Sequence, residues 1–345
     1  MTQSLFAIGL GVGTKNQKGE WLEVYYRTPL LNPSSHVVTA IATAGFDVGA
    51  NAAVELSNVQ LVALAKALRE AGALDQAEIA EALQDSTKPM VLAILAADEA
   101  PTSVPEAYLK LHLLSHRLVQ PHGIVLAGIF GVLPNVAWTG AGAIDLAELP
   151  QRQFAARLRG ELLEVMSVDK FPKMTNYVVP SGVRIAHTAR VRLGAYLGEG
   201  TTIMHEGFVN FNAGTEGPGM VEGRISAGVF VGAGSDLGGG CSTMGTLSGG
   251  NNIIISLGKG CLIGANAGVG IPLGDRCTIE AGLYVTAGSV AALLDDKGQL
   301  VRKVKARELA GKDDLLFRRN SQSGALEVLS NKTAIELNAE LHAHN

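Results

Sequence analysis

From about Val179 to Val290 an aliphatic residue returns at every sixth position, a period that neither an α-helix nor an alternating β-strand produces. Four blocks each keep one phase, and a small or modest residue follows most of these positions four places later. The positions are Val179, Ile185, Val191, Leu197, Ile203 and Val209; Ile225, Val231 and Leu237; Leu257, Ile263 and Val269; and Leu273, Ile279 and Val285. The pattern predicts a hexapeptide-repeat parallel β-helix, in which each six-residue step makes one short strand and one corner.

The phase of this repeat breaks twice, at Asn210–Met220 and at Gly238–Asn252. Extra residues in a solenoid are placed in loops on one side of it, and that side is often the binding side. We therefore expect two inserted loops beside the functional site.

Mixed helix and strand signals precede the repeat. Amphipathic periods predict helices over Ser57–Ala71, with Ser57 as N-cap, and over Asp75–Leu83, Val104–Val119 and Gln151–Met166. Apolar runs predict strands over Leu5–Val12, Trp21–Tyr26, Met90–Ala97 and Ile124–Phe130. We expect an N-terminal α+β domain over residues 1–175 that caps one end of a β-helix over residues 176–292. A C-terminal capping segment, residues 293–345, should contain a hairpin of Leu315–Arg319 with Leu326–Leu329 and a short helix from Thr333.

Two glycine and histidine patterns suggest sites but have simpler interpretations. Gly9, Gly11 and Gly13 do not match GxGxxG and precede a strand, so hairpin bending is favoured over phosphate binding. His112 and His116 lie four apart on a predicted helix, where ordinary surface or interface histidines are favoured over a metal pair. His187 and His205 are eighteen apart and should stack in successive coils. A β-helical zinc carbonic anhydrase needs a third histidine, which the sequence does not supply.

Composition narrows the class of protein. The 345 residues include 42 glycines and only 5% aromatic residues, which suits tight coils. A net charge of -4 argues against general nucleic-acid or membrane-surface binding. The three cysteines are odd in number without CxxC spacing, which favours free thiols in a reducing compartment. No signal peptide or membrane span is visible, so we expect a soluble cytoplasmic protein.

Many hexapeptide solenoids are enzymes that transfer acyl groups from coenzyme A. The fold alone is weak evidence of function, so a functional prediction has to rest on individual residues. Acyl transfer to an amine needs a proton acceptor, oxyanion donors and cations for carboxylates and phosphates. Glu222 with Arg224 could supply a base and an anion anchor, or could be a surface ion pair. The glycines of Gly238–Ser242 and Gly245–Gly250 could present N–H groups to an oxyanion or could simply give loop flexibility. Cys241 could be a nucleophile or a small packing residue.

A basic segment follows the repeat. It could bind the phosphates of coenzyme A or form a solvated face, and it consists of Arg302, Lys303, Lys305 and Arg307, with Arg318 and Arg319 further on.

Several longer motifs stand out: His205–Thr215, Met220–Gly228, Gly238–Gly249, Gly264–Gly268, Glu280–Tyr284 and Leu316–Ser321, with a further stretch over Ala107–Arg117. Together they resemble the tetrahydrodipicolinate N-succinyltransferase family of the lysine pathway, in the type with a long N-terminal domain. The resemblance implies a left-handed β-helix, a homotrimer with active sites between subunits, and small-molecule substrates. It also implies succinyl transfer from succinyl-CoA to the amino group of ring-opened tetrahydrodipicolinate.

The resemblance further implies roles for single residues. Glu222 matches the catalytic carboxylate, described in the family as forming an acyl-anhydride, although a general base would serve equally well. Glu206 matches a magnesium ligand near the trimer axis, while the position of a second acidic ligand in some relatives is Ala189 here. Matches to succinyl-CoA contacts are Arg224, Gly239, Ser242, Ala265, Glu280, Ala281, Gly288, Lys305, Arg318, Arg319, Asn320 and Ser321. Alternatives are another CoA-dependent N- or O-acyltransferase of the hexapeptide class, or a non-catalytic trimeric scaffold.

Overall fold

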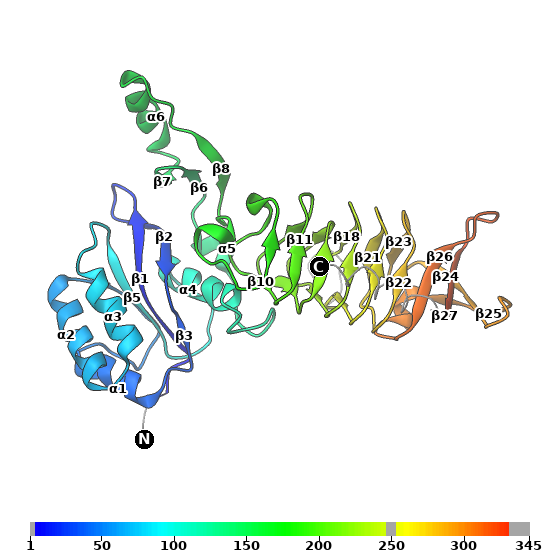
Figure 1. The fold of residues 1–345 in the computed structure, drawn as a ribbon, viewed down its shortest axis with the longest axis horizontal. Helices are drawn as coiled ribbons and strands as arrows, with labels where there is room; N and C mark the ends of the chain where they lie inside the picture. The colour runs from blue at the N-terminus through cyan, green and yellow to red at the C-terminus, as the bar shows by residue number, and fades with distance from the viewer. Residues whose placement is uncertain (1–3, 246–252, 331–345) are drawn as a thin grey trace. The chain divides into compact units, whose positions relative to one another are not determined.

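The computed structural model describes residues 4–245 and 253–330. The chain divides into two compact units, which are described separately (Figure 1). The first contains residues up to 113 and residues 123–172, and the second contains residues 114–122 and the chain from 173 onward. The helix predicted from Thr333 lies outside the described residues.

An antiparallel sheet forms the centre of the first unit, in the order β2-β1-β5-β4 with β3 also paired to β1. Its strands are β1 (Ala7–Lys15), β2 (Trp21–Tyr26), β3 (Leu30–Leu31), β4 (Ala52–Leu56) and β5 (Met90–Leu95). Its helices are α1 (Ser35–Thr43), α2 (Asn58–Glu70), α3 (Leu74–Leu83), α4 (Val104–Ser115) and α5 (Ile129–Val132). Ser57 caps α2 in a capping box with Gln60, as its position in the sequence predicts.

The predicted hairpin of β1 and β2 is present, but Gly9 and Gly11 make room for packed side chains rather than bending it. Ile8 and Leu10 point into a core with helices α1 to α3, whereas Gly9 and Gly11 face the other side of the sheet. A Cβ atom at Gly9 would lie 2.6 Å from the Tyr26 ring and 2.9 Å from Leu109 of α4. Only glycine allows these side chains to lie so close to the sheet.

His112 is fully buried, so the predicted surface or interface position is wrong for this residue. Its Nε2 accepts a hydrogen bond from the Tyr26 N–H at 3.2 Å, and its Nδ1 lies 2.7 Å from the Tyr108 carbonyl oxygen. The Tyr26 ring packs edge-on against the imidazole, with ring centroids 5.3 Å apart. His112 therefore joins α4 to the sheet as a neutral core residue.

A three-stranded sheet in the order β7-β6-β8 completes the first unit, with β6 (Val136–Thr139), β7 (Gly142–Asp145), β8 (Val165–Asp169) and helix α6 (Leu149–Leu158). Two predictions fail here. The segment predicted as strand Ile124–Phe130 forms turns, because Gly128 adopts a positive φ of 77° before α5. The helix predicted to reach Met166 ends at Leu158, because Gly160 adopts φ 76° and the chain then enters β8.

The second unit is a triangular parallel β-helix with three faces. Face A contains β10 (Ala195–Leu197), β13 (Ala213–Thr215), β16 (Phe230–Val231) and β19 (Ser256–Leu257). Face B contains β9 (Arg184–Ile185), β11 (Thr201–Ile203), β14 (Gly219–Val221), β17 (Asp236–Leu237), β20 (Leu262–Ile263) and β22 (Thr278–Ile279). Face C contains β12 (Phe208–Val209), β15 (Arg224–Ile225), β18 (Ser242–Thr243), β21 (Gly268–Gly270) and β23 (Tyr284–Thr286). Short 3₁₀ turns η1 (Met174–Asn176) and η2 (Thr188–Arg190) precede β10.

Strand register corrects the prediction of a loop at Asn210–Met220. That stretch contains β13 and β14, and Leu197 pairs with Thr215 and Ile203 with Val221, eighteen residues apart. The phase changes instead after Val221, because Val209 pairs with Ile225 only sixteen residues on. Glu222 and Arg224 therefore lie at a shortened corner and not after an inserted loop.

The second phase break is displaced in the same way. Arg224 pairs with Ser242 eighteen residues on, so Gly238–Thr243 keeps the regular coil. Phe230 then pairs with Ser256, twenty-six residues on, so the extra residues fall between β18 and β19, and residues 246–252 of that stretch lie outside the described part.

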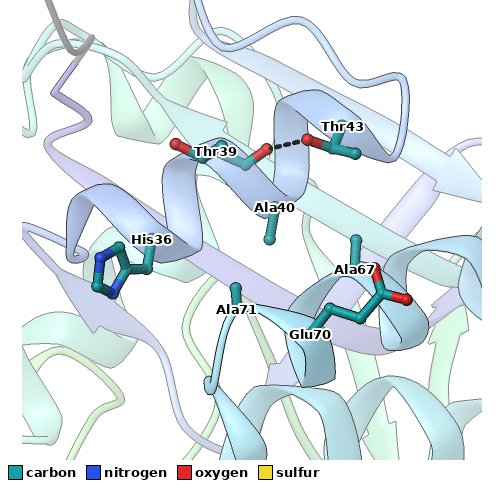
Figure 2. A pocket seen from close by; sticks show the side chains of 7 residues that line it. All are labelled: His36, Thr39, Ala40, Thr43, Ala67, Glu70 and Ala71. Carbon is teal, nitrogen blue, oxygen red and sulfur yellow. Dashed lines mark hydrogen bonds between the residues drawn. The ribbon is translucent and has the colours of Figure 1, made fainter.

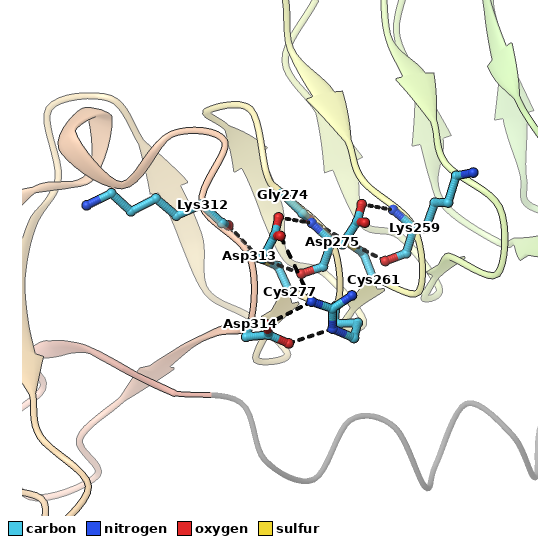
Figure 3. A network of polar contacts seen from close by, with 9 residues as sticks. Lys259, Cys261, Gly274, Asp275, Cys277, Lys312, Asp313 and Asp314 are labelled. Carbon is cyan, nitrogen blue, oxygen red and sulfur yellow. Dashed lines mark hydrogen bonds and ion pairs between the residues drawn. The ribbon is translucent and has the colours of Figure 1, made fainter.

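The tail covers the last coil. Strands β24 (Val290–Leu294), β25 (Leu300–Lys305), β26 (Leu315–Arg319) and β27 (Leu326–Ser330) extend face B beyond β22, and β26 with β27 forms the predicted hairpin. Leu309 of the 3₁₀ turn η3 (Ala306–Leu309) is buried there. A polar network ties the tail to the coils: Asp313 accepts from the Asp275 N–H, and Asp275 accepts from the Lys259 N–H (Figure 3). Arg276 also binds Asp314.

Residues 114–122 cover the outer edge of face A. Ser115 Oγ accepts from the Gly194 N–H at 2.9 Å and donates to the Ala195 carbonyl at 3.1 Å. The His122 N–H donates to Asn212 Oδ1 at 3.0 Å. The two Ser115 bonds satisfy backbone groups at the start of the first strand of face A, β10, whose edge would otherwise remain open. Within the described residues, no helix is long and apolar enough to cross a bilayer, and the cytoplasmic location stays a prediction.

Candidate functional site

Most of the predicted site residues lie in one column along the corner between faces B and C, called here the BC corner. Successive coils contribute Glu222, Gly239, Ala265, Ala281 and Arg319 to it. The Asn266 N–H donates to Gly239 O at 2.9 Å, the Gly282 N–H to Ala265 O at 2.8 Å, and the Arg319 N–H to Glu280 Oε2 at 2.6 Å. Adjacent coils of a parallel sheet lie about 4.8 Å apart, so the column spans roughly 19 Å. Gly239, Ala265 and Ala281 bear only hydrogen or methyl groups there, and both alanines are exposed.

Glu222 lies beside an available N–H group. A Cβ at Gly239 would be 3.3 Å from Glu222 Oε2, so the carboxylate lies directly over this glycine. The N–H groups of Gly238, Gly240, Cys241 and Ser242 donate to backbone carbonyls of the solenoid. Among the described residues the Gly239 N–H has no acceptor. An exposed carboxylate beside a free N–H is the pairing that a proton acceptor and an oxyanion donor require.

Arg224 and Ser242 lie next to this pair on face C. Their positions pair in adjacent strands, and Arg224 is exposed while Ser242 is half-buried. The guanidinium is thus free to bind a carboxylate at one side of Glu222.

Cys241 does not fit a nucleophile. It is fully buried, and a Cβ at Gly223 would lie 2.3 Å from its Sγ, so the thiol fills the space that this glycine leaves. Burial raises the pKa of the Cys241 thiol to about 12, so it is protonated at neutral pH. The packing interpretation of this cysteine is the one the structure supports.

At the far end of the column, side chains of the β26–β27 hairpin are held in place by hydrogen bonds to one another. Arg318 Nε donates to Glu327 Oε2 at 2.9 Å and Asn320 Nδ2 to Glu327 Oε1 at 2.8 Å, which together lower the pKa of Glu327. Asn320 Oδ1 also accepts from the Gln322 and Ser323 N–H groups. Arg319 and Ser321 are exposed at this turn. Arg318 and Asn320 therefore position the turn, and Arg319 is the more accessible cation.

Two residues matched to succinyl-CoA contacts, Gly288 and Lys305, lie away from the BC corner. Gly288 follows β23, at the edge of face C that is opposite the BC corner. Lys305 lies near it, since Lys305 pairs with Val290 and the Ala306 N–H donates to Ser289 O at 2.8 Å. A single chain therefore does not bring Gly288 and Lys305 to the Glu222 column.

Glu206 lies at the BC corner of an earlier coil and is already neutralised. It binds Arg190 at 2.6 Å and His205 at 3.0 Å, and hydrogen bonding from His205, followed by the charge of Arg190, lowers its pKa. His205 packs against His187 with ring centroids 5.2 Å apart, as the eighteen-residue spacing predicts. The described residues contain no group of three metal-ligating side chains. One carboxylate bound to a guanidinium does not fit a magnesium site within one chain.

A hollow of about 410 Å³ lies between α1 and α2 of the first unit (Figure 2). Its lining is mainly alanine and threonine side chains, with His36 and Glu70 at its margins. Thr43 Oγ1 donates to the Thr39 carbonyl and is thereby satisfied within α1. None of the residues predicted from the sequence lines this hollow.

Comparison with known proteins matches the chain to three family models. Residues 40–131 match the N-terminal part of tetrahydrodipicolinate N-succinyltransferase, residues 133–173 its middle part, and residues 254–287 the hexapeptide repeat of succinyl-transferase. A relative from Pseudomonas paraeruginosa, named 2,3,4,5-tetrahydropyridine-2,6-dicarboxylate N-succinyltransferase, is 68% identical with 100% of both chains covered. The chain belongs to the tetrahydrodipicolinate N-succinyltransferase family.

More distant relatives agree with this assignment. A protein of the same name from Vibrio cholerae is 58% identical over 99% of each chain. A crystal structure from Campylobacter jejuni, described as a candidate 2,3,4,5-tetrahydropyridine-2-carboxylate N-succinyltransferase, has a TM-score of 0.87 at 33% identity, covering 97% of this chain and 94% of that one. The predicted family and the predicted fold class, a left-handed parallel β-helix with an N-terminal α+β domain, are confirmed.

Proposed function

We propose that this chain transfers succinyl from succinyl-CoA to the amino group of ring-opened tetrahydrodipicolinate, L-2-amino-6-ketopimelate, in lysine and diaminopimelate biosynthesis. Family membership supports the reaction. The observation that carries the assignment of the site is the exposed Glu222 carboxylate beside the free Gly239 N–H.

The chemistry follows from these groups. The acceptor amine attacks the thioester carbonyl, a C–N bond forms, and the carbonyl oxygen becomes an oxyanion that the Gly239 N–H stabilises. Glu222 accepts the amine proton. The C–S bond then breaks, and the CoA thiolate leaves and takes a proton, which Glu222 can return. Arg224 binds a substrate carboxylate beside Glu222.

A covalent route uses the same carboxylate. Glu222 attacks the thioester, CoA leaves, and the resulting anhydride acylates the amine. The two routes differ in one observable: only the anhydride route releases CoA stoichiometrically before the acceptor is added.

The BC corner suits the extended pantetheine arm of the cosubstrate. Ala265 and Ala281 are exposed, and their small side chains leave room for a linear ligand that runs from Glu222 towards Arg319. Gly288 and Lys305 lie at the opposite edge of face C, so in a homotrimer a neighbouring chain would supply these two residues. A magnesium ion near the trimer axis would need Glu206 from several chains, and no step of the reaction depends on it.

Thiol release tests the proposal. The protein should release more than one CoA per site from succinyl-CoA only when L-2-amino-6-ketopimelate is present, and acetyl-CoA should be used far less well. A preference for acetyl-CoA would indicate a different acyltransferase. Absence of thiol release above background, together with no protection by CoA in thermal unfolding, would favour the non-catalytic scaffold.

A further inference from the structure

Five outward positions form one row across face C, running from the first coils to the last. Phe208 pairs with Arg224, Arg224 with Ser242, Ser242 with Gly268 and Gly268 with Tyr284. Residues paired in register in a parallel sheet project to the same side. Their neighbours in the same strands, such as Ile225, Val269 and Val285, are buried inside the coil, so the row faces outward.

Tyr284 leans from its own strand over Gly268. A Cβ built on Gly268 would lie 2.1 to 2.3 Å from three carbons of the Tyr284 ring, so the ring lies directly on this glycine. Ser242 adjoins Gly268 on the side away from Tyr284, and the ring therefore extends towards Ser242 and Arg224. The Tyr284 side chain remains 49% exposed, which leaves part of the ring surface open.

The row thus joins a cation, a hydroxyl and an apolar surface. Arg224 can hold a carboxylate, and the Tyr284 ring offers the aliphatic chain behind that carboxylate a surface on which to pack. Both substrates of the proposed reaction are carboxylate-terminated aliphatic chains. A chain held at Arg224 with its reacting carbon at Glu222 is confined to this part of face C.

We propose that Tyr284 is a specificity-determining wall that packs against the aliphatic chain of the carboxylate-terminated group held at Arg224 and limits the length of that chain. The inference rests on the proposed function and deepens it. Gly268 makes room for the Tyr284 ring, because any larger side chain at position 268 would displace that ring.

Kinetics of Tyr284→Ala, Tyr284→Phe and Gly268→Ala test this. If the succinyl chain packs on the ring, Tyr284→Ala should raise kcat/KM for glutaryl-CoA relative to succinyl-CoA by about tenfold, the discrimination typical of one methylene in an apolar pocket. If the acceptor chain packs there, the KM for L-2-amino-6-ketopimelate should rise by about tenfold with the acyl preference unchanged. Gly268→Ala should reproduce the same change with the ring still present, and Tyr284→Phe should resemble the wild type.

The matched control is Tyr196→Ala, which removes a tyrosine from face A, where it packs against Phe230 with centroids 5.6 Å apart. It should leave both quantities unchanged. Variants with wild-type thermal unfolding whose acyl preference and acceptor KM both stay at the wild-type values would overturn the wall. Failure of the wild-type protein itself to release CoA would instead refute the proposed function, and this inference with it.

Discussion

Glu222 and Cys241 lie on neighbouring coils near the same corner, and exposure separates their chemistry. The carboxylate lies over Gly239 at the surface, whereas the thiol fills the space at Gly223 and is fully buried. Burial in apolar surroundings disfavours the thiolate, which is the reactive form of a cysteine. At the residue scale the site therefore depends on one acid and on glycine N–H groups, without a thiol nucleophile.

Replacing Glu222 with glutamine should lower kcat by about 10²- to 10⁴-fold, because the amide cannot accept the amine proton. The KM for succinyl-CoA should change little, because the Gly239 N–H and Arg224 remain. Steady-state thiol release measures both constants. Glu216→Gln, which alters a carboxylate bound to Lys259 at a different corner, is the control and should keep wild-type turnover. Turnover of Glu222→Gln close to the control would remove Glu222 from the chemistry.

At the scale of strands, threonine explains why the sequence predicted the repeat but misplaced its breaks. Thr215 occupies an inward position that the pattern reserves for aliphatic residues, and its Oγ1 is satisfied by Thr201 Oγ1 at 2.8 Å in the core. Thr243 does the same in β18, where its Oγ1 accepts from the Ser226 N–H and donates to the Arg224 carbonyl. A search for aliphatic residues misses a buried threonine whose hydrogen bonds are satisfied by a neighbouring coil, 14 to 19 residues away in the sequence.

The site residues likewise fall into two groups: those that a local sequence motif identifies, and those whose positions depend on strand pairing with distant parts of the chain. The motif around Glu222 was sufficient to single out the acid and its arginine. The position of Gly288 and Lys305 at the opposite edge of face C depends on which strand precedes each corner, which only the register reveals. The length predicted for helix α6 is too great, because a search for apolar residues does not detect Gly160. This glycine ends the helix by adopting a positive φ.

Filling the BC corner should block the cosubstrate. Ala265→Leu adds three carbons at an exposed position, so it should leave the core intact but raise the dissociation constant for CoA by about tenfold or more. Isothermal titration measures this directly. Ala233→Leu places the same side chain at the corner between faces A and B and should bind CoA like the wild type. Equal CoA affinity in the two variants would mean that the pantetheine arm does not follow the BC corner.

The tail network should make stability depend on acid pH. Hydrogen bonding to Arg276 lowers the pKa of Asp314 from the ordinary value of an aspartate. A carboxyl group with a depressed pKa stabilises the folded state above its unfolded pKa and loses that contribution as the pH falls through the folded value. Asp314→Asn should therefore unfold at a lower temperature than the wild type at pH 7, with the difference shrinking below about pH 4. Asp85→Asn, at an exposed position after α3, controls for the change in net charge. A difference in melting temperature that is constant from pH 7 to pH 3 would contradict this linkage.

At the scale of the whole molecule, one chain separates residues that the reaction would use together. Glu222, Arg224 and Ser242 lie towards the BC corner, and Gly288 with Lys305 lies across face C. In a closed trimer each interface joins two different edges of neighbouring chains. The separation thus favours sites built from one chain's Glu222 and the next chain's Lys305.

Mixed trimers distinguish shared sites from single-chain sites. Glu222→Gln should be inactive and Lys305→Glu should bind succinyl-CoA weakly, because its charge would repel the phosphates. If each site draws Glu222 and Lys305 from different chains, every trimer that contains both variants has both native residues in one of its three sites, so the mixed trimers should reach about one third of the wild-type activity. Coexpression with two different affinity tags, followed by purification through both, yields the mixed trimers for the thiol-release assay. Mixed trimers no more active than the Lys305→Glu protein alone would place both residues in the site of a single chain, because in that case no rearrangement of subunits could reunite an intact pair.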